Sequence, residues 1–296
     1  VLGSKGTESD GKTPSNSASR AYCPPGNVEG NCAPGLNPAP VGEWSLDDGS
    51  GTTAKDKSGN NNTGTLTNGP TWVTNGKSGN ALSFDGTDDY VNISSSTSMV
   101  TQNAITVEGW VNRSNFVDAD TLYVLGSQSS TLGYHWLYLY SNSINWQYAY
   151  TTSYRAKTAT YTFNNDTWYH IAVTHDYTSG SINFYVNGQL ISQQSQGTDV
   201  PVPVSGKSSK IGTYSGSSHI FQGLIDEVKI YNYARTPAQI AWDYNRGAPV
   251  GWWRMDEGQG TTAHDYSGNG NNGTLTNMDP ATDWVAGKNN GALDFD

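Results

Sequence analysis

Two short loops carry the residues best suited to hold a metal ion. Residues 56–62 read Asp-Lys-Ser-Gly-Asn-Asn-Asn, and residues 265–271 repeat the pattern as Asp-Tyr-Ser-Gly-Asn-Gly-Asn. Oxygen-bearing side chains at alternate positions of a glycine-rich turn, with its free carbonyl groups, suit Ca²⁺. The pattern therefore predicts calcium ligands at Asp56, Asn60 and Asn62. An alternative stays open, because Asp-x-Ser-Gly is also ordinary turn chemistry in which the aspartate accepts backbone hydrogen bonds.

A second acidic cluster follows in the segment Asp-Gly-Thr-Asp-Asp. Its carboxylates belong to Asp85, Asp88 and Asp89, which are close enough in sequence to share one cation. Hard cations take several carboxylate oxygens, but aspartates are equally common in solvated turns. We treat this cluster as the second metal candidate.

A third candidate is aromatic, because tyrosine and tryptophan are concentrated in residues 133–155. Aromatic faces stack on sugar rings, and nearby amide side chains bind hydroxyl groups. In the stretch 135–140 the aromatic residues alternate with leucines, so one face of that strand must lie in the core. We expect more than half of these rings to be structural. The glycan-binding candidates are Trp146, Tyr148 and Tyr154.

An internal repeat organises the elements that must position these residues. The stretch from Val41 to Asp85 recurs from Val250 to Asp296, with Trp44 matching Trp253. The copies start a domain length apart, which differs from the short period of a solenoid. We expect three segments: a linker at residues 1–40, a complete domain at residues 41–249, and the truncated start of a second domain at residues 250–296.

Composition restricts the class of protein. The chain has 34 Gly, 18 Tyr and 10 Trp with only 14% charged residues, which is typical of strands and turns rather than helices. Its net charge of -10 argues against a nucleic-acid partner, which needs clustered Lys and Arg. No apolar run reaches the length of about 18 residues that a membrane span needs.

The linker contains both cysteines of the chain. Cys23 and Cys32 lie in a segment rich in Ser, Gly and Pro, and together they would close a short loop. We interpret them as one disulfide of an exported protein, since no histidine or further cysteine lies near enough in sequence to complete a metal site.

Alternating apolar residues predict a series of strands beyond the first copy of the repeat. The clearest unit covers residues 168–192, with three strands and an Asn187-Gly188 turn of the type I′ hairpin kind. Thr236 and Pro237 can cap and begin one short helix that ends near Asn245. Hairpins without intervening helices predict an all-β fold of two antiparallel sheets packed face to face.

These segments together resemble a known family. The series WSLDDGSGTTAKDKSGNNNTGTL, ALSFDGTDDYV, ITVEGWV, WYHIAVTHD and GLIDEVKIYNYARTPAQI is similar to the laminin-G-like, concanavalin A-type jelly-roll domains of secreted and cell-surface proteins. The resemblance covers almost all of residues 41–245. It implies a structural calcium ion near the 56–62 loop, with Asp226 as a further ligand. It does not imply one function, because the family includes sugar binders, adhesion modules and spacers.

Enzyme motifs are missing. The E-x-D-x-x-E motif of glucanases in the same superfamily does not occur, nor does G-x-S-x-G, and the five histidines show no metal-ligand spacing. The glutamates of the complete domain, Glu43, Glu108 and Glu227, are far apart in sequence, although distant carboxylates can converge in a fold. We expect a protein that is not an enzyme.

Two functions from different classes follow. The first is an extracellular or cell-surface binding and adhesion module, lectin-like and calcium-stabilised, that recognises polysaccharide or a surface protein and gains avidity from tandem copies. The second is a structural subunit of a filament, sheath or surface layer. In that case the incomplete second copy would add to the sheet edge of another chain, in a head-to-tail contact that generates fibres.

Overall fold

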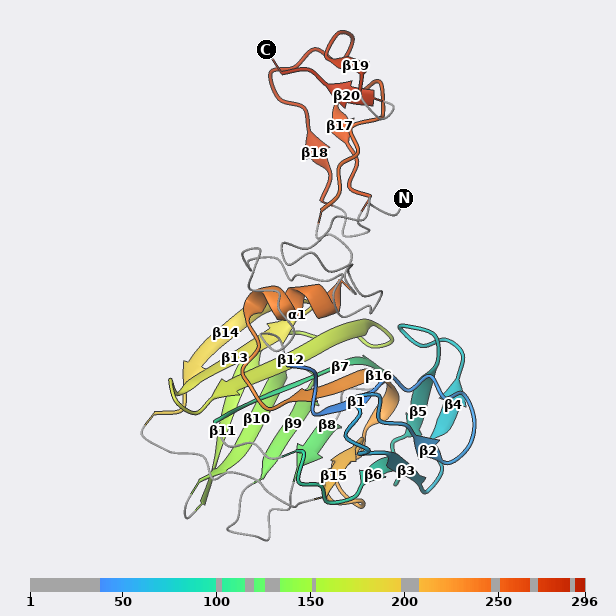
Figure 1. The fold of residues 1–296 in the computed structure, drawn as a ribbon, viewed down its shortest axis with the longest axis vertical. Coiled ribbons are helices and arrows are strands. Elements are labelled where there is room, and N and C mark those ends of the chain that lie inside the picture. Colours follow the sequence, from blue (N-terminus) through green and yellow to red (C-terminus); the bar gives the residue numbers. More distant parts are fainter. Residues whose placement is uncertain are drawn as a thin grey trace, which may run out of the picture. The chain divides into compact units, whose positions relative to one another are not determined.

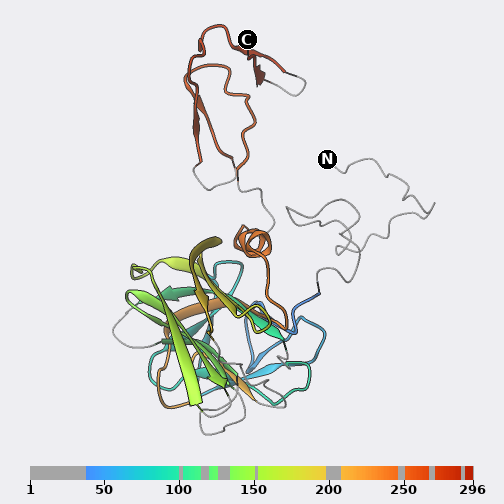
Figure 2. The same cartoon turned by 90° about the vertical axis from the view of Figure 1, so that its left-hand side faces the viewer.

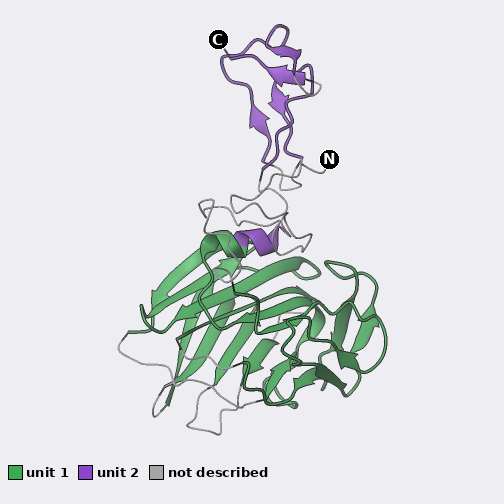
Figure 3. Cartoon of the chain, in the orientation of Figure 1, with its two compact units in different colours: residues 1–240 green, residues 241–296 purple. Residues whose placement is uncertain are grey.

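The computed structural model of the chain describes residues 38–99, 103–114, 120–125, 134–150, 153–197, 208–245, 251–266, 271–287 and 291–295. The chain forms two compact units, residues 1–240 (unit one) and residues 241–296 (unit two), shown in Figure 3. The division falls inside α1 (Pro237–Tyr244). The predicted disulfide between Cys23 and Cys32 lies outside the described residues.

Unit one contains two antiparallel sheets of eight strands each among its described residues (Figures 1 and 2). Sheet A has the order β14 (Gln189–Ser195), β13 (Ser181–Val186), β12 (Trp168–Asp176), β7 (Ala104–Arg113), β16 (Gln222–Tyr231), β5 (Ala81–Asp85) and β4 (Thr71–Val73), with β1 (Gly42–Trp44) also paired to β16.

Sheet B joins segments that are equally far apart in sequence. Its order is β11 (Ser153–Thr160), β10 (Ser143–Tyr150), β9 (His135–Tyr140), β8 (Asp120–Leu125), β15 (Ser209–Ile211), β6 (Tyr90–Ile93), β3 (Gly64–Thr67) and β2 (Thr53–Ala54). The two sheets confirm the predicted all-β sandwich.

Local sequence explains the turns that were expected. Asn187 and Gly188 both adopt positive φ, 50° and 76°, as a type I′ hairpin turn requires, and they connect β13 to β14. Helix α1 begins at Pro237, and the Thr236 hydroxyl accepts a hydrogen bond from the Gln239 amide at 3.3 Å. The side chain of Ile240 then packs on Ala172 and Tyr185 of sheet A.

The core of unit one fills the space between the sheets. Alternate residues of each strand point inward, so β7 contributes Ile105, Val107 and Val111, while β16 contributes Val228 and Ile230. Burying this apolar surface provides most of the free energy that stabilises the sandwich.

Unit two repeats the local structure of the first copy. The Trp253 indole donates a hydrogen bond to the Asn271 carbonyl at 2.7 Å, as the Trp44 indole does to the Asn62 carbonyl at 2.9 Å. Its short strands are β17 (Thr262–Ala263) with β18 (Gly273–Thr274), and β19 (Trp284–Ala286) with β20 (Gly291–Leu293). Within the described part of the chain, no helix is long and apolar enough to cross a membrane.

Candidate functional site

The outer face of sheet B, turned away from sheet A, carries the most distinctive surface of unit one. Successive side chains of a strand point to opposite faces of its sheet. On β9, Leu137 and Leu139 therefore enter the core, whereas Trp136 and Tyr138 belong to a separate outer cluster. We call the outer set the aromatic face: Trp136, Tyr138, Tyr140, Tyr154 and Tyr214.

Ring contacts hold the aromatic face together. Trp136 stacks on Tyr138 with ring centroids 3.9 Å apart, and Tyr214 lies 4.3 Å from Trp136. Tyr140 meets Tyr138 edge to face at 5.8 Å. The Trp136 indole donates a hydrogen bond to the Thr121 hydroxyl at 2.9 Å, which fixes the ring plane. Such a cluster is a rigid platform with little conformational entropy left to lose on binding.

Two tyrosines remain open to solvent at the margin of this platform. The residue surface is 40% exposed for Tyr140 and 49% exposed for Tyr154, whereas Trp136 and Tyr138 are largely covered. Burial is also the main cause that raises the pKa of Tyr138, so its hydroxyl stays protonated and can donate a hydrogen bond.

Amide and hydroxyl groups lie beside the rings on the same face. The strand register sets Asn145 opposite both Tyr138 and Thr158, and Gln147 opposite Trp136. The Thr158 hydroxyl donates a hydrogen bond to the Asn145 side-chain oxygen at 2.7 Å. On this face the side chains of β9 and β10 are uncharged, and among them Tyr140 is exposed whereas Asn145 and Gln147 are buried beside the rings.

Two of the three predicted glycan-binding residues lie elsewhere. Trp146 and Tyr148 are fully buried in the core, so the prediction that they contact a glycan is wrong. They alternate with Asn145 and Gln147 on β10, and the amides take the outer face. Tyr154 does lie on the outer face, and its binding role stays a prediction.

Trp146 instead takes part in a buried histidine network. Its indole donates a hydrogen bond to His175 Nδ1 at 3.2 Å, and its ring stacks on His135 at 5.3 Å. The Tyr177 hydroxyl is 2.7 Å from His135 Nε2. Burial lowers the pKa of His135 to about 3 and that of His175 to about 4. Both imidazoles are neutral near pH 7, and this network belongs to the structure of the core.

The first predicted metal loop is a hydrogen-bonded turn. The Asp56 carboxylate accepts hydrogen bonds from the backbone N–H groups of Glu43, Ser58 and Asn62 at 3.0, 2.9 and 2.7 Å. The side-chain amides of Asn60 and Asn62 both donate to the Val41 carbonyl, at 3.2 and 2.7 Å. The turn alternative, which the sequence left open, accounts for these contacts.

Asp226 has different neighbours from those that the resemblance implied. Its carboxylate is buried and accepts hydrogen bonds from the backbone N–H groups of Ser78 and Glu227, both at 2.9 Å. Burial raises its pKa to about 7, and the negative charges that act on it are those of Glu227 and Asp47. Asp226 and Asp56 thus accept hydrogen bonds from different backbone groups, and the shared calcium site of Asp56, Asn60, Asn62 and Asp226 stays a prediction.

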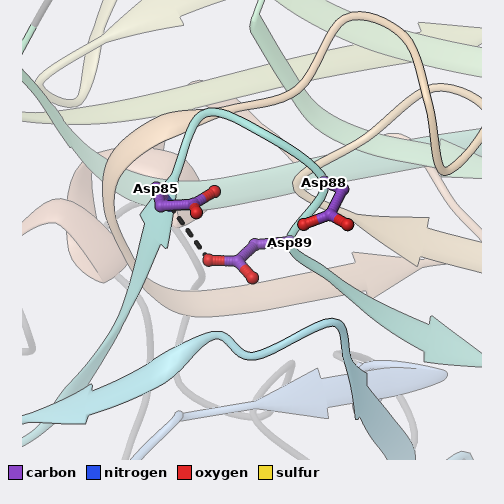
Figure 4. A group of neighbouring side chains, drawn as sticks. All are labelled: Asp85, Asp88 and Asp89. Atoms are coloured by element: carbon purple, nitrogen blue, oxygen red, sulfur yellow. Dashed lines mark hydrogen bonds between the residues drawn. The ribbon is translucent and has the colours of Figure 1, made fainter.

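The second acidic cluster does come together. Figure 4 shows Asp85, Asp88 and Asp89 around the turn between β5 and β6, and their carboxylate oxygens lie within 4.8 Å of one another. Asp89 accepts a hydrogen bond from the Asp85 amide at 3.0 Å. Burial and the negative charges of its two neighbours raise the pKa of Asp89, which shows the repulsion that a cation would relieve.

Comparison with solved structures identifies similar folds. Domain 4 of AbnA, an extracellular GH43 arabinanase from Geobacillus stearothermophilus solved in complex with arabinotriose, is 21% identical with a TM-score of 0.55, over 70% of this chain and 98% of that one. The binding domain of Paraclostridial Mosquitocidal Protein 1 is 16% identical with a TM-score of 0.54, over 70% and 52%.

A third structure is the ligand-binding domain of botulinum neurotoxin serotype D, in complex with N-acetylneuraminic acid. It is 15% identical with a TM-score of 0.56, over 72% of this chain and 52% of that one. The chain thus spans about half the length of these two toxin domains. At such identities the likeness shows the fold alone. No curated protein sequence matches the chain.

A family model provides the assignment. The Laminin_G_3 model, described as the concanavalin A-like lectin/glucanases superfamily, matches residues 85–241, which is more than half of the chain. This span contains all five residues of the aromatic face and most of the sandwich. The chain belongs to the concanavalin A-like lectin/glucanases superfamily.

Proposed function

We propose that the chain is a non-catalytic glycan-binding module of an extracellular protein, and that the aromatic face of sheet B holds the sugar. The observation that carries the proposal is the pair of exposed rings, Tyr140 and Tyr154, beside the buried ring stack of Trp136 and Tyr138 that supports them. Similar folds that were solved with arabinotriose and with N-acetylneuraminic acid support a sugar ligand.

The charge of the face favours one class of sugar. The outer side chains of β9 and β10 carry neither a positive nor a negative charge, so nothing on these strands would pair with a carboxylate. Stacking and neutral hydrogen bonds suit an uncharged oligosaccharide. We therefore expect arabinan-type neutral oligosaccharides to bind more tightly than sialylated ones.

The glutamates support a non-catalytic role. Glu43, Lys229 and Glu108 lie side by side in register across β1, β16 and β7 of sheet A, so a lysine separates the two carboxylates. This arrangement neutralises charge within a sheet. It does not form an acid and base pair at the aromatic face.

The test is a glycan array probed with the full chain and with Tyr140→Ala and Tyr154→Ala. Each variant is expected to lose about tenfold in affinity, because removing one stacked ring costs about 1.4 kcal/mol. Tyr266→Ala is the matched control, since Tyr266 is similarly exposed but belongs to unit two. A variant that combines Tyr140→Ala and Tyr154→Ala is tested as well. If it binds every glycan as the native chain does, or if the native chain binds none, the proposal fails.

A structural calcium ion, which the resemblance implied near the 56–62 loop, has a second candidate site at Asp85, Asp88 and Asp89, whose carboxylate oxygens lie within 4.8 Å of one another. The cation would offset the repulsion among the three carboxylates and link β5 to β6. At calcium concentrations about 100 times its Kd, the expected gain in unfolding free energy is about 2.7 kcal/mol. Calorimetry with calcium or with EDTA measures this gain.

Two variants give that measurement its controls. Asp89→Asn is expected to abolish the calcium response, because it removes a charge from the cluster. Asp176→Asn should keep the response, because Asp176 caps an unrelated turn through the Thr178 and Ser179 amides. An equal melting temperature of the native chain in calcium and in EDTA would exclude the ion.

A further inference from the structure

The turn between β15 and β16 holds an exposed histidine in an unusual backbone conformation. His219 has a φ of 52°, in the left-handed region that residues other than glycine rarely adopt. Histidine enters this region more often than most side chains do, as asparagine and aspartate also do. Holding a residue there costs free energy, and such positions cluster at ligand-binding and active sites.

Hydrogen bonds on both sides of His219 fix the turn. The Thr121 amide of β8 donates to the His219 carbonyl at 3.4 Å. Within the turn, the Tyr214 amide and the Thr213 hydroxyl both donate to the Ser218 carbonyl, at 3.2 and 3.1 Å. The fold therefore sets the conformation of His219 before any ligand binds.

The turn places the His219 imidazole against the aromatic face. Its ring centroid lies 5.0 Å from that of Trp136 and 6.0 Å from that of Tyr214. Thr121 connects His219 to Trp136, because its hydroxyl accepts the indole hydrogen bond and its amide donates to the His219 carbonyl. His219 thus continues the ring surface beyond Trp136.

The imidazole offers polar groups that the buried rings do not. His219 is exposed, whereas Trp136 beside it is buried. The described contacts of the imidazole are ring contacts, which leave its two nitrogens, a donor and an acceptor in the neutral form, to a ligand. The hydroxyl groups of Ser215 and Ser217 are exposed in the same turn. Such groups can exchange hydrogen bonds with the hydroxyl groups of a sugar.

His219 and Tyr140 lie too far apart to contact one sugar unit. Trp136, which contacts His219, and Tyr140 are four residues apart on β9, which corresponds to about 13 Å along a strand. The buried ring of Tyr138 lies between them, 3.9 Å from Trp136 and 5.8 Å from Tyr140. The exposed groups of the face are therefore at two places, His219 at one and Tyr140 with Tyr154 at the other.

We propose that His219 holds a second sugar unit of the same ligand, so that the aromatic face selects chains of several neutral sugars over short ones. The imidazole would exchange hydrogen bonds with the hydroxyl groups of one unit while Tyr140 or Tyr154 stacks on another. The role of His219 rests on the proposed glycan-binding function and adds a dependence on chain length to it.

Calorimetric titration of the full chain with two linear arabinan fragments, a disaccharide and a hexasaccharide, tests this dependence. The native chain is expected to bind the hexasaccharide at least about tenfold more tightly, because two places then hold one ligand. His219→Gly should bind the hexasaccharide roughly five- to tenfold more weakly, which is the effect of about one hydrogen bond. It should bind the disaccharide as the native chain does, because the exposed tyrosines hold the short ligand.

Three measurements distinguish a ligand contact from a packing role. His219→Gly should melt no lower than the native chain, because glycine adopts positive φ without steric cost. His219→Asn should keep most of the hexasaccharide affinity, because asparagine tolerates the same φ and both donates and accepts hydrogen bonds. Asp166→Gly is the matched control, since Asp166 is also exposed with a φ of 54° but lies outside the aromatic face. It should leave both affinities unchanged.

Two results would overturn the role of His219 and leave the proposed function standing. In the first, Tyr140→Ala and Tyr154→Ala weaken glycan binding, but His219→Gly binds the hexasaccharide as the native chain does. In the second, the native chain binds a glycan through these tyrosines but binds the hexasaccharide no more tightly than the disaccharide, or binds neither fragment. A native chain that binds no glycan at all would overturn both proposals.

Discussion

Trp44 and Trp253 make the same indole hydrogen bond in two copies of one motif, yet only Trp44 is withdrawn from solvent. The difference lies in what surrounds each copy rather than in the copies themselves. Turn residues and local hydrogen bonds determine the shape of the motif, whereas burial comes from strands distant in sequence. Shape and burial are thus separable properties of the same stretch of chain.

The largest expected effect is a difference between two matched tryptophan substitutions. Trp44→Ala is expected to lower the unfolding free energy of unit one by about 3–5 kcal/mol, because it opens a cavity in the core. Trp253→Ala should cost unit two under about 1 kcal/mol, because the ring is already partly in solvent. Denaturant titration monitored by hydrogen exchange measures the unfolding free energy of each unit in the same chain. Similar losses of unfolding free energy in Trp44→Ala and Trp253→Ala would contradict the claim that only Trp44 is stabilised by burial.

Lowering the pH should also change the unfolding free energies of the two units by different amounts. His135 and His175 are buried in unit one with lowered pKa values, whereas His264, the histidine of unit two, is exposed. As the pH falls below about 6.5, the unfolded chain takes up protons before folded unit one does. Each buried histidine then lowers the unfolding free energy by about 1.4 kcal/mol per pH unit, down to its own folded pKa.

His135→Gln isolates this contribution. Between pH 6.5 and 4.5 the variant should lose about 2.3 kcal/mol less stability than the native chain, as measured by urea unfolding. Asp226 acts in the opposite direction, because its pKa is raised and folded unit one takes up that proton first below about pH 7. Its contribution is common to both chains and cancels in the difference. Parallel pH profiles would show that His135 does not titrate in this way.

The smallest expected effect concerns the turn aspartates. Asp56→Ala leaves three partly buried backbone donors without an acceptor, at a cost of about 1–3 kcal/mol to unit one. Asp265→Ala should cost less, because its hydrogen bonds to Trp252 and Asn271 are open to water, which can replace the carboxylate. Melting curves of the two variants measure the difference. A larger loss of stability in Asp265→Ala than in Asp56→Ala would mean that the motif depends more on its turn hydrogen bonds than on burial by distant strands.

The sandwich could be predicted because its signals are local. Alternation located β7, β12 and β16, and the Asn187-Gly188 pair specified a hairpin whose positive φ angles the structure contains. The repeat could be aligned by eye, and its matched tryptophans make matched hydrogen bonds. Strands, turns and repeats of this kind can be predicted from residues that are close together in the sequence.

The sites were harder to predict because they depend on which face of a strand is covered. In β9 both faces are apolar, so alternation alone does not identify the core side. In β10 a usable signal was present, since Asn145 and Gln147 alternate with Trp146 and Tyr148, and polar amides are disfavoured in the apolar core that Trp146 and Tyr148 join. The surroundings of Asp226 were hard to predict for a different reason, because its carboxylate accepts a hydrogen bond from Ser78, which is 148 residues away in sequence.

The position of β16 between β1 and β5 has a consequence for synthesis on the ribosome. The chain must grow from Asp85 to Gln222 before β16 exists, which takes on the order of ten seconds at ordinary translation rates. During that interval the first copy lacks the strand that pairs with both β1 and β5 in folded unit one, so the burial of Trp44 must wait for a segment made much later.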